Sequence, residues 1–315
     1  MTKVKYLRKR EAEHLLWTQR HDYNFTVEIH KRMNRLKKEL VKETQDIILK
    51  HSKELDISPE EFSRLVATTD IEELQSKVAR YVSMPELSER AKNELAWYNK
   101  VTRLSRAELL TRSMDVHLTG TIGEIEYLFA NHLHDMTLEE LRRQAGILGL
   151  SVAEQRDLFL RAKSIAEAPF HGATYSENLW LWKEKAEDAL IQGLHRSLIL
   201  GQNPVKWMKS LEKFYIGEID NLTYATKRLA VTESARAQIY AQKVSYEVSE
   251  YDEFMVICEP TACPECTPFD GKTEKVQVMS VGDNAPPFHP NCKCSTAANL
   301  SDEVVEKAIQ DWLNR

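Results

Sequence analysis

The chain has 315 residues, enough for two domains, and its 42% hydrophobic and 29% charged residues are ordinary for a globular protein. A net charge of −5 argues against a general polyanion binder, and no stretch reaches the ~18 apolar residues of a membrane span. The N-terminus carries charge without an apolar run, so we expect no signal peptide, no membrane anchor, and folding in a reducing cytoplasm.

The first 50 residues form a basic arm, with 13 lysines and arginines against 7 acidic residues. Such an arm fits contact with nucleic acid or with an acidic protein surface. The other interpretation is a solvated helix with a surplus of lysine, because charge runs often have no partner. The candidate contact residues are Lys31, Arg32, Arg35, Lys37 and Lys38.

Helical periodicity dominates the first two thirds of the chain. Residues 22–51 place apolar side chains at intervals of three, four or seven, which predicts one stripe on a long helix. If this stripe were exposed in the isolated chain, it would indicate a partner surface. The stripe comprises Phe25, Ile29, Met33, Leu36, Leu40 and Ile47.

Capping signals predict where further helices begin and end. Ser58 before Pro59 predicts one start, and Ser83 or Met84 before Pro85 predicts another, for a helix that continues to about residue 114. Thr137 with Glu140 has the spacing of a capping box, and Gly149 predicts a helix end.

The helical pattern breaks at Pro169 and Gly172, and we predict a domain boundary near residue 170. Helices are expected over 176–204, 203–215 and 222–249, followed by strands over 252–260 and 274–281. The predicted fold class is mainly α, with long N-terminal helices and a small α+β zinc-binding module near the C-terminus. The predicted domains are 1–170, 171–300 with a Cys/His metal module over 258–294, and a helix over 301–315.

The five cysteines all lie between residues 258 and 294. Cys263 and Cys266 form a C-x2-C pair, and His289, Cys292 and Cys294 follow after the second predicted strand. Two close pairs brought together by a hairpin can supply the four tetrahedral ligands that Zn²⁺ prefers. Because the module has few apolar residues, metal binding would contribute folding free energy directly, on the order of 10 kcal/mol. We predict a structural zinc site made of four of these five residues.

The residue that is left out stays open at this point. In an extended segment Cys292 and Cys294 would point to opposite sides, so we expect only one of them to bind. Cys258 falls within a predicted strand and is expected to be buried rather than bound. The alternative to a metal is a set of reduced, partly buried thiols, or a disulfide that forms only after cell lysis.

Signatures of metal enzymes and nucleotide-binding loops do not occur in the sequence. No histidine is followed by x-Glu, and Ala262 precedes the cysteine pair, which excludes the zinc deaminase pattern. H-E-x-x-H, G-x-x-x-x-G-K-[ST] and G-x-G-x-x-G are absent. A nuclease built around His289 would need a metal-binding His or Asn in a following helix, and no histidine follows. A cysteine nucleophile beside His289 suits four thiols around one imidazole less well than a metal does.

Residues 175–298 resemble the C-terminal signature of the Mu F-like phage head morphogenesis proteins, also called minor head or minor capsid proteins. That family's pattern is a helix with arginine and Thr-Glu, then C-x2-C, Asp-Gly-Lys, and a closing Pro-Pro-x-His-Pro-x-Cys-Arg-Cys. The chain departs from it at Lys293, which keeps the charge of arginine but loses its bidentate geometry. Besides the cysteines and His289, the matching residues are Arg228, Thr232, Glu233, Asp270, Gly271, Lys272, Pro286, Pro287 and Pro290.

The resemblance implies a minor capsid protein of a tailed bacteriophage, located in the virion and, during assembly, in the host cytoplasm. The implied partners are the portal protein, with scaffolding protein, major capsid protein and packaged DNA as further candidates. Some members of the family are thought to leave the head with the genome. Within the signature, we expect Glu233 to pair with Arg236, or with Arg228 across a turn, and so to fasten the helix to the metal module. The other interpretation of Glu233 is a plain surface glutamate.

Two classes of function remain, a structural component of the virion and an enzyme carried in it, either a DNA-processing nuclease or a toxin-like effector. About 20 residues follow Cys294 and predict a single helix, so we expect no further domain there. No acid–base pair outside the metal ligands is brought together by sequence spacing. We therefore expect the protein not to be an enzyme.

Overall fold

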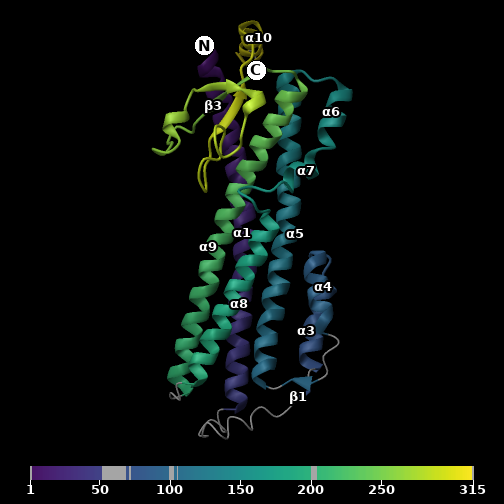
Figure 1. Ribbon diagram of the computed structural model, residues 1–315, viewed down its shortest axis with the longest axis vertical. Coiled ribbons are helices and arrows are strands. Elements are labelled where there is room, and N and C mark those ends of the chain that lie inside the picture. The colour runs from purple at the N-terminus through teal and green to yellow at the C-terminus, as the bar shows by residue number, and fades with distance from the viewer. Residues whose placement is uncertain are drawn as a thin grey trace. The chain divides into compact units, whose positions relative to one another are not determined.

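Long helices account for most of the computed structural model, which describes residues 2–51, 69–70, 72–98, 103–104, 106–199 and 204–313 (Figure 1). The predicted fold class is confirmed: helices are followed by a small three-stranded sheet near the C-terminus. The described helices are α1 (Lys3–His51), α3 (Glu72–Val82), α4 (Glu89–Tyr98), α5 (Arg106–Leu148), α6 (Val152–Phe159), α7 (Ala162–Ala166), α8 (Tyr175–Ile199), α9 (Pro204–Val248) and α10 (Asp302–Leu313).

The chain divides into two compact units, each assembled from separate stretches of sequence. The first unit takes Met1–Thr26, Ala130–Tyr175 and Lys227–Arg315, and the second takes Val27–Phe129 and Ser176–Thr226. The predicted boundaries at residues 170 and 300 divide the chain in another way, and they stay a prediction.

The second unit is built on helices, with one antiparallel pair of short strands, β1 (Thr69–Asp70) and β2 (Arg103–Leu104). On α5, a Cβ atom at Gly120 would overlap the Tyr81 ring of α3, and one at Gly123 would overlap Ala91 of α4. Glycine at these positions therefore allows two helices to approach α5 closely. The apolar stripe of α1 is covered by this packing, since Ile29, Met33, Leu36 and Leu40 are fully buried.

A charged cluster also lies inside the second unit. The imidazole of His117 on α5 contacts two carboxylates of α1, Glu39 at 3.2 Å from Nδ1 and Glu43 at 2.8 Å from Nε2. Lys77 pairs with Glu43, and Arg80 pairs with Glu39. Burial lowers the pKa of His117, but its hydrogen bonds to Glu39 and Glu43 outweigh this, and the net pKa is raised.

The first unit combines the start of α1, the end of α5, the end of α9 and the sheet. Strand β3 (Glu253–Ile257) lies between β4 (Thr273–Lys275) and β5 (Ser295–Ala298), and both pairings are antiparallel. The sheet shares its apolar core with the helices, because Leu7 of α1 and Ile239 and Tyr246 of α9 pack with Phe254, Val256 and the buried cysteines. In Figure 1 these strands lie beside the N-terminal end of α1.

Several predicted elements are confirmed at their ends. Gly149 follows the last residue of α5 and has φ of 71°, a left-handed conformation that glycine adopts without strain. The first predicted strand corresponds to β3, with Cys258 one residue beyond its end and 6% exposed. The predicted C-terminal helix corresponds to α10.

Other predicted elements are wrong. Thr137 and Glu140 cap no helix, because α5 continues through them; the Thr137 hydroxyl donates to the carbonyl of Leu133, and Glu140 binds Arg143. The helices expected over 203–215 and 222–249 are one helix, α9, since Gly217 alone does not interrupt it. The helix expected from residue 83 begins at Glu89 instead.

The second predicted strand is also mostly wrong. Only its start is a strand, β4, and a 3₁₀ turn follows over Val276–Val278. Strand β5 was not expected, because its Ser-Thr-Ala-Ala sequence lacks the large β-branched and aromatic residues that favour strands. The described part of the stripe on α1 is buried, so the condition for a partner surface there is not met. The Ile47 side chain and the Ser58–Pro59 signal lie outside the described residues.

Candidate metal centre

The candidate ligands come from two turns that face each other across the sheet module. In the first turn the amide groups of Cys266 and Thr267 both donate to the carbonyl of Cys263, which fixes the C-x2-C pair on one side. In the second, the amide of Cys292 donates to the carbonyl of His289 at 3.1 Å. Local backbone hydrogen bonds therefore place the ligands before any metal contributes.

His289 lies against both sulfurs of the C-x2-C pair. Its Nε2 atom is 3.1 Å from Sγ of Cys263 and 3.1 Å from Sγ of Cys266. Its other ring nitrogen, Nδ1, is 2.9 Å from the carbonyl oxygen of Pro290. Because a carbonyl can only accept, Nδ1 carries the proton and the lone pair of Nε2 faces the sulfurs. In metal-binding histidines, a hydrogen bond from the ring nitrogen that does not bind the metal orients the imidazole.

Cys266 also belongs to a second group of donors. The sulfurs of Cys266, Cys292 and Cys294 lie within 4.8 Å of one another, and those of Cys266 and Cys292 are 3.7 Å apart. Sulfurs about 2.3 Å from a tetrahedral zinc ion would be separated by about 3.8 Å. The closest contacts therefore link Cys263, His289, Cys266 and Cys292.

The expectation that Cys292 and Cys294 point to opposite sides is wrong. Asn291 has φ of 63°, the segment before β5 is not a regular strand, and both sulfurs are buried close together while Lys293 between them is exposed. Alternation places residues two apart on the same face, so the expectation misapplied it to Cys292 and Cys294. The predicted ligands Cys263, Cys266, His289, Cys292 and Cys294 thus lie in two overlapping groups of three.

The electrostatics of the cluster suit a cation. Burial and the neighbouring sulfur of Cys292 raise the pKa of Cys266, and the hydrogen bond with Cys294, together with burial, raises the pKa of Cys292. Several thiolates cannot stay charged side by side in a buried place unless a positive charge compensates them. A bound divalent cation supplies that charge, and a coordinating thiol is deprotonated. The donor set of sulfur and imidazole therefore fits a metal ion, whose identity the geometry leaves open.

The Asp-Gly-Lys turn anchors the module to α1. Asp270 accepts hydrogen bonds from the amide of Cys258 at 3.0 Å and from the guanidinium of Arg8 at 2.7 Å. Burial raises the pKa of Asp270, but the hydrogen bond from Arg8 outweighs it and the pKa is lowered. Gly271 has φ of 75°, as the turn requires, and Lys272 lies over the ring of Phe269.

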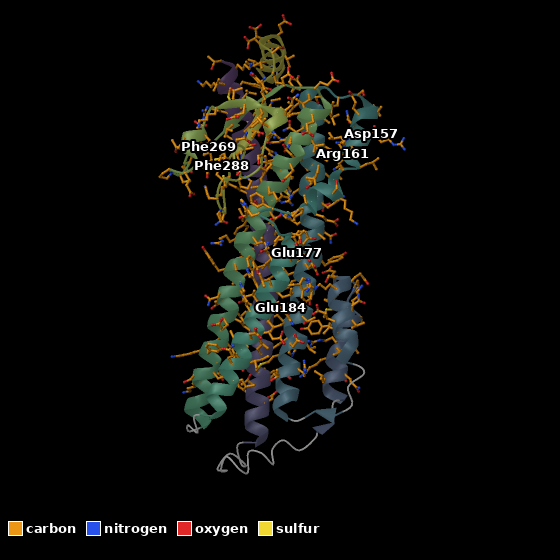
Figure 2. All side chains as sticks on the ribbon, in the orientation of Figure 1. Asp157, Arg161, Glu177, Glu184, Phe269 and Phe288 are labelled. Carbon is orange, nitrogen blue, oxygen red and sulfur yellow. The ribbon has the colours of Figure 1, made fainter. Side chains whose placement is uncertain are left out.

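Aromatic stacking joins the two ligand-bearing turns. Phe269 stacks on Phe288 with ring centroids 4.0 Å apart, and Figure 2 labels both rings. Phe288 directly precedes His289, and Pro287 before it is buried. The apolar pair therefore holds the second turn near the first.

The two residues of the Thr-Glu pair on α9 make different contacts, one to the ligand segment and one to Arg236. The hydroxyl of Thr232 accepts a hydrogen bond from the amide of Asn291 at 3.1 Å, which ties α9 to the ligand segment. Glu233 is 2% exposed and pairs with the fully buried Arg236 at 2.6 Å, so the surface interpretation of Glu233 is wrong. Arg228 is exposed, and its backbone carbonyl accepts a hydrogen bond from the Thr232 hydroxyl.

Arg236 fastens α9 to α7 rather than to the metal module. Its two terminal nitrogens donate to the carbonyls of Ile165 at 2.8 Å and Ala166 at 2.7 Å, at the C-terminal end of α7. A cation there satisfies carbonyls that lack a helical partner and complements the helix dipole. The Glu233–Arg236 pairing was expected, but its attachment to the module was not correct.

A buried polar network joins β5 to three helices, and no motif or periodicity in the sequence predicts it. Arg143 on α5 holds Glu11 of α1 through two contacts of 3.0 Å and Glu140 through two of 2.8 Å. Ser295, directly after Cys294, donates to Glu11 at 2.9 Å, and Gln242 donates to Glu140 at 2.9 Å. The ligand segment is therefore held by the helices as well as by its own turns.

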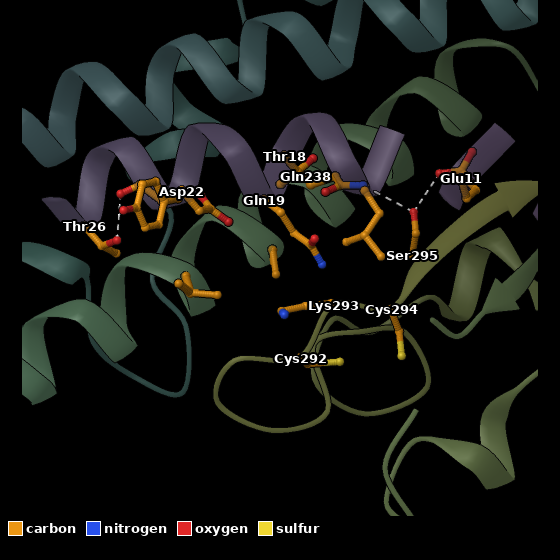
Figure 3. Close-up of a pocket in the computed structure, with 14 residues that line it drawn as sticks. Glu11, Thr18, Gln19, Asp22, Thr26, Gln238, Cys292, Lys293, Cys294 and Ser295 are labelled. Atoms are coloured by element: carbon orange, nitrogen blue, oxygen red, sulfur yellow. Dashed lines mark hydrogen bonds between the residues drawn. The ribbon is translucent and has the colours of Figure 1, made fainter. Parts of the chain in front are cut away.

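A cavity of about 270 Å³ lies between α1, α9 and the segment Cys292–Ser295 (Figure 3). Asp22, one of its lining residues, lies 3.3 Å from His132, and His132 also lies 3.1 Å from Ser234. A catalytic triad uses different ring nitrogens for the acid and the hydroxyl. Here both contacts are made to Nε2, and Ser234 is fully buried, so these three residues form a structural hydrogen-bond cluster.

The basic candidates on α1 are mostly engaged within the second unit. Lys31 pairs with Glu28, Arg32 with Glu28 and Glu124, Arg35 with Glu124, and Lys37 with Asp220. Lys38 is exposed. These ion pairs reduce the positive charge that is available to nucleic acid. Binding of a partner by the basic arm stays a prediction.

Comparison with known families bears on residues 184–297, which match the family described as Phage Mu protein F like protein. This segment is Mu F-like. The match covers all of α9, both ligand-bearing turns and all but the last residue of β5, so the resemblance inferred from the signature residues is confirmed. It links the metal module to a bacteriophage protein family. A search of curated proteins and a search of solved structures each found no match.

The described helices also bear on membrane association. None of them combines the length and the apolar composition that a membrane crossing requires.

Proposed function

We propose that the protein is a minor capsid, or head morphogenesis, protein of a tailed bacteriophage, and that it acts as a structural component of the head. The observation that carries this proposal is the Mu F-like match over residues 184–297. The fold supports it, because the matched segment contains two turns that converge on one cluster of metal-ligand groups rather than on a substrate cleft.

The metal we propose is a structural zinc ion held by Cys263, Cys266, His289 and Cys292. Zinc in such a site closes a tetrahedron of protein ligands and leaves no open position for substrate. Two hydrogen bonds within the chain position these ligands: the Pro290 carbonyl orients His289, and Thr232 holds the second turn on α9. The ion would thereby fix the two turns to each other while hydrogen bonds fix them to the helices.

The proposed partner is the portal protein at the packaging vertex. The proposed location of the protein itself is inside the capsid. The family resemblance supports this, and the basic arm offers a surface for an acidic partner. Contact with packaged DNA, and departure with the genome, are further proposals. The internal ion pairs of Arg32, Arg35 and Lys37 favour a protein contact over DNA, because counterion release requires free cations.

A structural role is proposed in preference to catalysis. The enzyme alternative, a nuclease or toxin-like effector, would need a water-accessible acid–base pair or an open metal position. The His132 cluster offers neither geometry nor access. A nuclease assay on metal-loaded protein with plasmid and single-stranded DNA would reveal activity if the enzyme alternative were correct.

The head assignment is tested by co-expression of the tagged protein with the portal and scaffolding proteins of the same genome. We expect the protein to sediment with procapsids, and to be recovered with portal rings when the capsid protein is omitted. A protein that stays at the top of the gradient in both experiments would overturn the proposal. Binding to DNA is measured separately, as salt-dependent retention on duplex DNA.

A further inference from the structure

Cys258 and Cys294 face each other where β3 and β5 end. The last pair of the β3–β5 ladder is Ile257 with Ser295, so Cys258 and Cys294 are the next residues directly opposite each other. Their side chains are in hydrogen-bonding contact, and both are buried, at 6% and 5% exposure. The two thiols thus form a pair of their own at the edge of the metal cluster.

The ladder also defines the type of this pair. The amide of Asn299 donates to the carbonyl of Glu253, its opposite residue, at 2.9 Å, which makes that pair a hydrogen-bonded one. Hydrogen-bonded and non-hydrogen-bonded pairs alternate along an antiparallel ladder, so Cys258 and Cys294 occupy a non-hydrogen-bonded position. The Cα atoms of such pairs are about 4.5 Å apart, which lies within the range that a disulfide spans.

The proposed metal site leaves this pair available. The donors with the closest contacts are Cys263, His289, Cys266 and Cys292, and they complete four ligands without Cys294. Cys294 lies within 4.8 Å of Cys266 and Cys292, but its other neighbour is the Cys258 thiol. Cys294 also contacts the Cys292 thiol, and its place opposite Cys258 in the ladder is what separates it from the other candidates.

Cys258 also borders a cavity that suits an anionic reagent. The cavity has a volume of about 230 Å³ and is lined by Cys258, Arg8 and Lys293, with Glu11 and Glu259 among the other lining residues. The charge of Glu11 is already matched by Arg143. Arg8 is itself paired with Asp270 at 2.7 Å, so the exposed Lys293 is the cation that favours a small disulfide carrying carboxylates, such as glutathione disulfide.

We propose that Cys258 and Cys294 are a redox pair that closes to a cross-strand disulfide while the metal stays bound by the other four ligands. In the first exchange a Cys258 thiolate attacks glutathione disulfide, forms a mixed disulfide and releases one glutathione thiolate. Cys294 then attacks the Cys258 sulfur of the mixed disulfide and releases the second glutathione. The net change is that two cysteine thiols lose two electrons and two protons, and one glutathione disulfide becomes two glutathione thiols.

This inference rests on the proposed metal site for its ligand assignment and on the proposed phage head for its purpose. Thiols persist in a reducing cytoplasm, where the head would assemble, and disulfides persist outside the cell. The closed bond would join β3 to β5 around both ligand-bearing turns. A particle released by lysis would then carry a module that no longer depends on the metal alone.

The test uses the full-length, zinc-loaded protein, reduced, freed of reductant, and then treated with glutathione disulfide. Native mass spectrometry should show loss of the mass of two hydrogens with zinc retained, and the oxidised form should melt at a higher temperature. Cleavage after Glu265, Lys272 and Lys293 leaves Cys258 and Cys263 on one peptide and puts Cys266, Cys292 and Cys294 on three others. Fragmentation of the cross-linked peptide between Glu259 and Cys263 then tells Cys258 from Cys263.

The expected cross-link joins Cys258 to Cys294, and Cys258→Ser and Cys294→Ser should abolish it and keep the zinc, whereas Cys292→Ser should lose the zinc. A disulfide that includes Cys263, Cys266 or Cys292, zinc release on oxidation, or no disulfide in folded protein would overturn the inference. The wild-type peptide map gives this answer even if a variant fails to fold. Protein that contains no zinc but still forms the Cys258–Cys294 cross-link would contradict the proposed zinc site and support the proposed redox pair.

Discussion

Replacing Arg143 should be the most damaging change to the buried network that carries β5. Its guanidinium makes four contacts of 2.8–3.0 Å with Glu11 and Glu140, whose side chains are each 2% exposed. Arg143→Met keeps the apolar stem and removes the cation shared by two buried carboxylates, so that of their basic neighbours Glu11 keeps only Arg10 at 3.1 Å and Glu140 only His14 at 3.0 Å. Removing one partner of a buried pair costs about 3–5 kcal/mol. The neighbouring hydrogen bonds from Ser295 and Gln242 remain and limit the loss to that range.

The next residue provides a matched control. Arg142 is 57% exposed and pairs with Glu139 at 3.7 Å, so Arg142→Met should change the free energy of unfolding by less than about 0.5 kcal/mol. Both variants are measured by urea unfolding followed by circular dichroism, at pH 7 and pH 5. Equal losses in the two variants would refute the argument from burial.

The pH dependence gives a second test of the same argument. Burial raises the pKa of Glu11 and Glu140, but the charge of Arg143 outweighs it, and both pKa values are lowered in the folded protein. Their contribution to wild-type stability is therefore present above the ordinary value of about 4.5 and lost as the pH falls through the lowered values. Without Arg143 the largest influence that lowers these pKa values is lost, and both rise relative to the wild type although Arg10 and His14 remain. The deficit of Arg143→Met should shrink from pH 7 to pH 5, and a pH-independent deficit would contradict this account.

Three further predictions concern other contacts. Glu233→Ala leaves Arg236 buried without a counter-ion and should cost about 3–5 kcal/mol of unfolding free energy in urea, with the zinc content unchanged, because Arg236 binds α7. Thr232→Val removes the acceptor of the Asn291 amide and should cost about 1 kcal/mol in the same assay. The raised pKa of His117 gives stability that is present below about pH 6.5 and lost as the pH rises through the folded value, and His117→Gln should remove this pH dependence of the urea midpoint.

Controls for these three follow from the same helices. Thr226→Val on α9 removes a hydroxyl that bonds only its own helix, to the carbonyl of Leu222, and should be nearly neutral. A loss equal to that of Thr232→Val would count against the tie to Asn291. Zinc loss in Glu233→Ala would restore the original expectation that Glu233 fastens the metal module. If the urea midpoint of His117→Gln kept the pH dependence of the wild type, that dependence would come from a group other than His117.

Periodicity and short motifs were sufficient for much of the fold. The stripe on α1, the end of α5 at Gly149, strand β3 and the gathering of the metal ligands all follow from local spacing. Local spacing failed where tertiary contacts override it. Thr137 and Glu140 have the spacing of a cap, but Glu140 binds Arg143 and Gln242 inside a continuous helix.

Contacts between distant segments could not be predicted. The pairing of Ser295 with Glu11 spans nearly the whole chain, and β5 has too little apolar bulk to be recognised as a strand. The relation of Cys292 to Cys294 was misjudged because residues two apart in extended backbone lie on the same face, as the buried cysteines on either side of the exposed Lys293 do. Where residues act through long-range hydrogen bonds, one sequence carries little signal of them.

The central claim is that a metal ion joins the two cysteine-bearing turns, and its most direct test is the metal content of the full-length protein purified without chelator. Elemental mass spectrometry should find about one zinc per chain. Cys266→Ser, which removes the residue shared by both donor groups, should abolish it and lower the melting temperature, whereas Cys258→Ser should keep it. Wild-type protein that folds cooperatively without any bound metal would contradict the account.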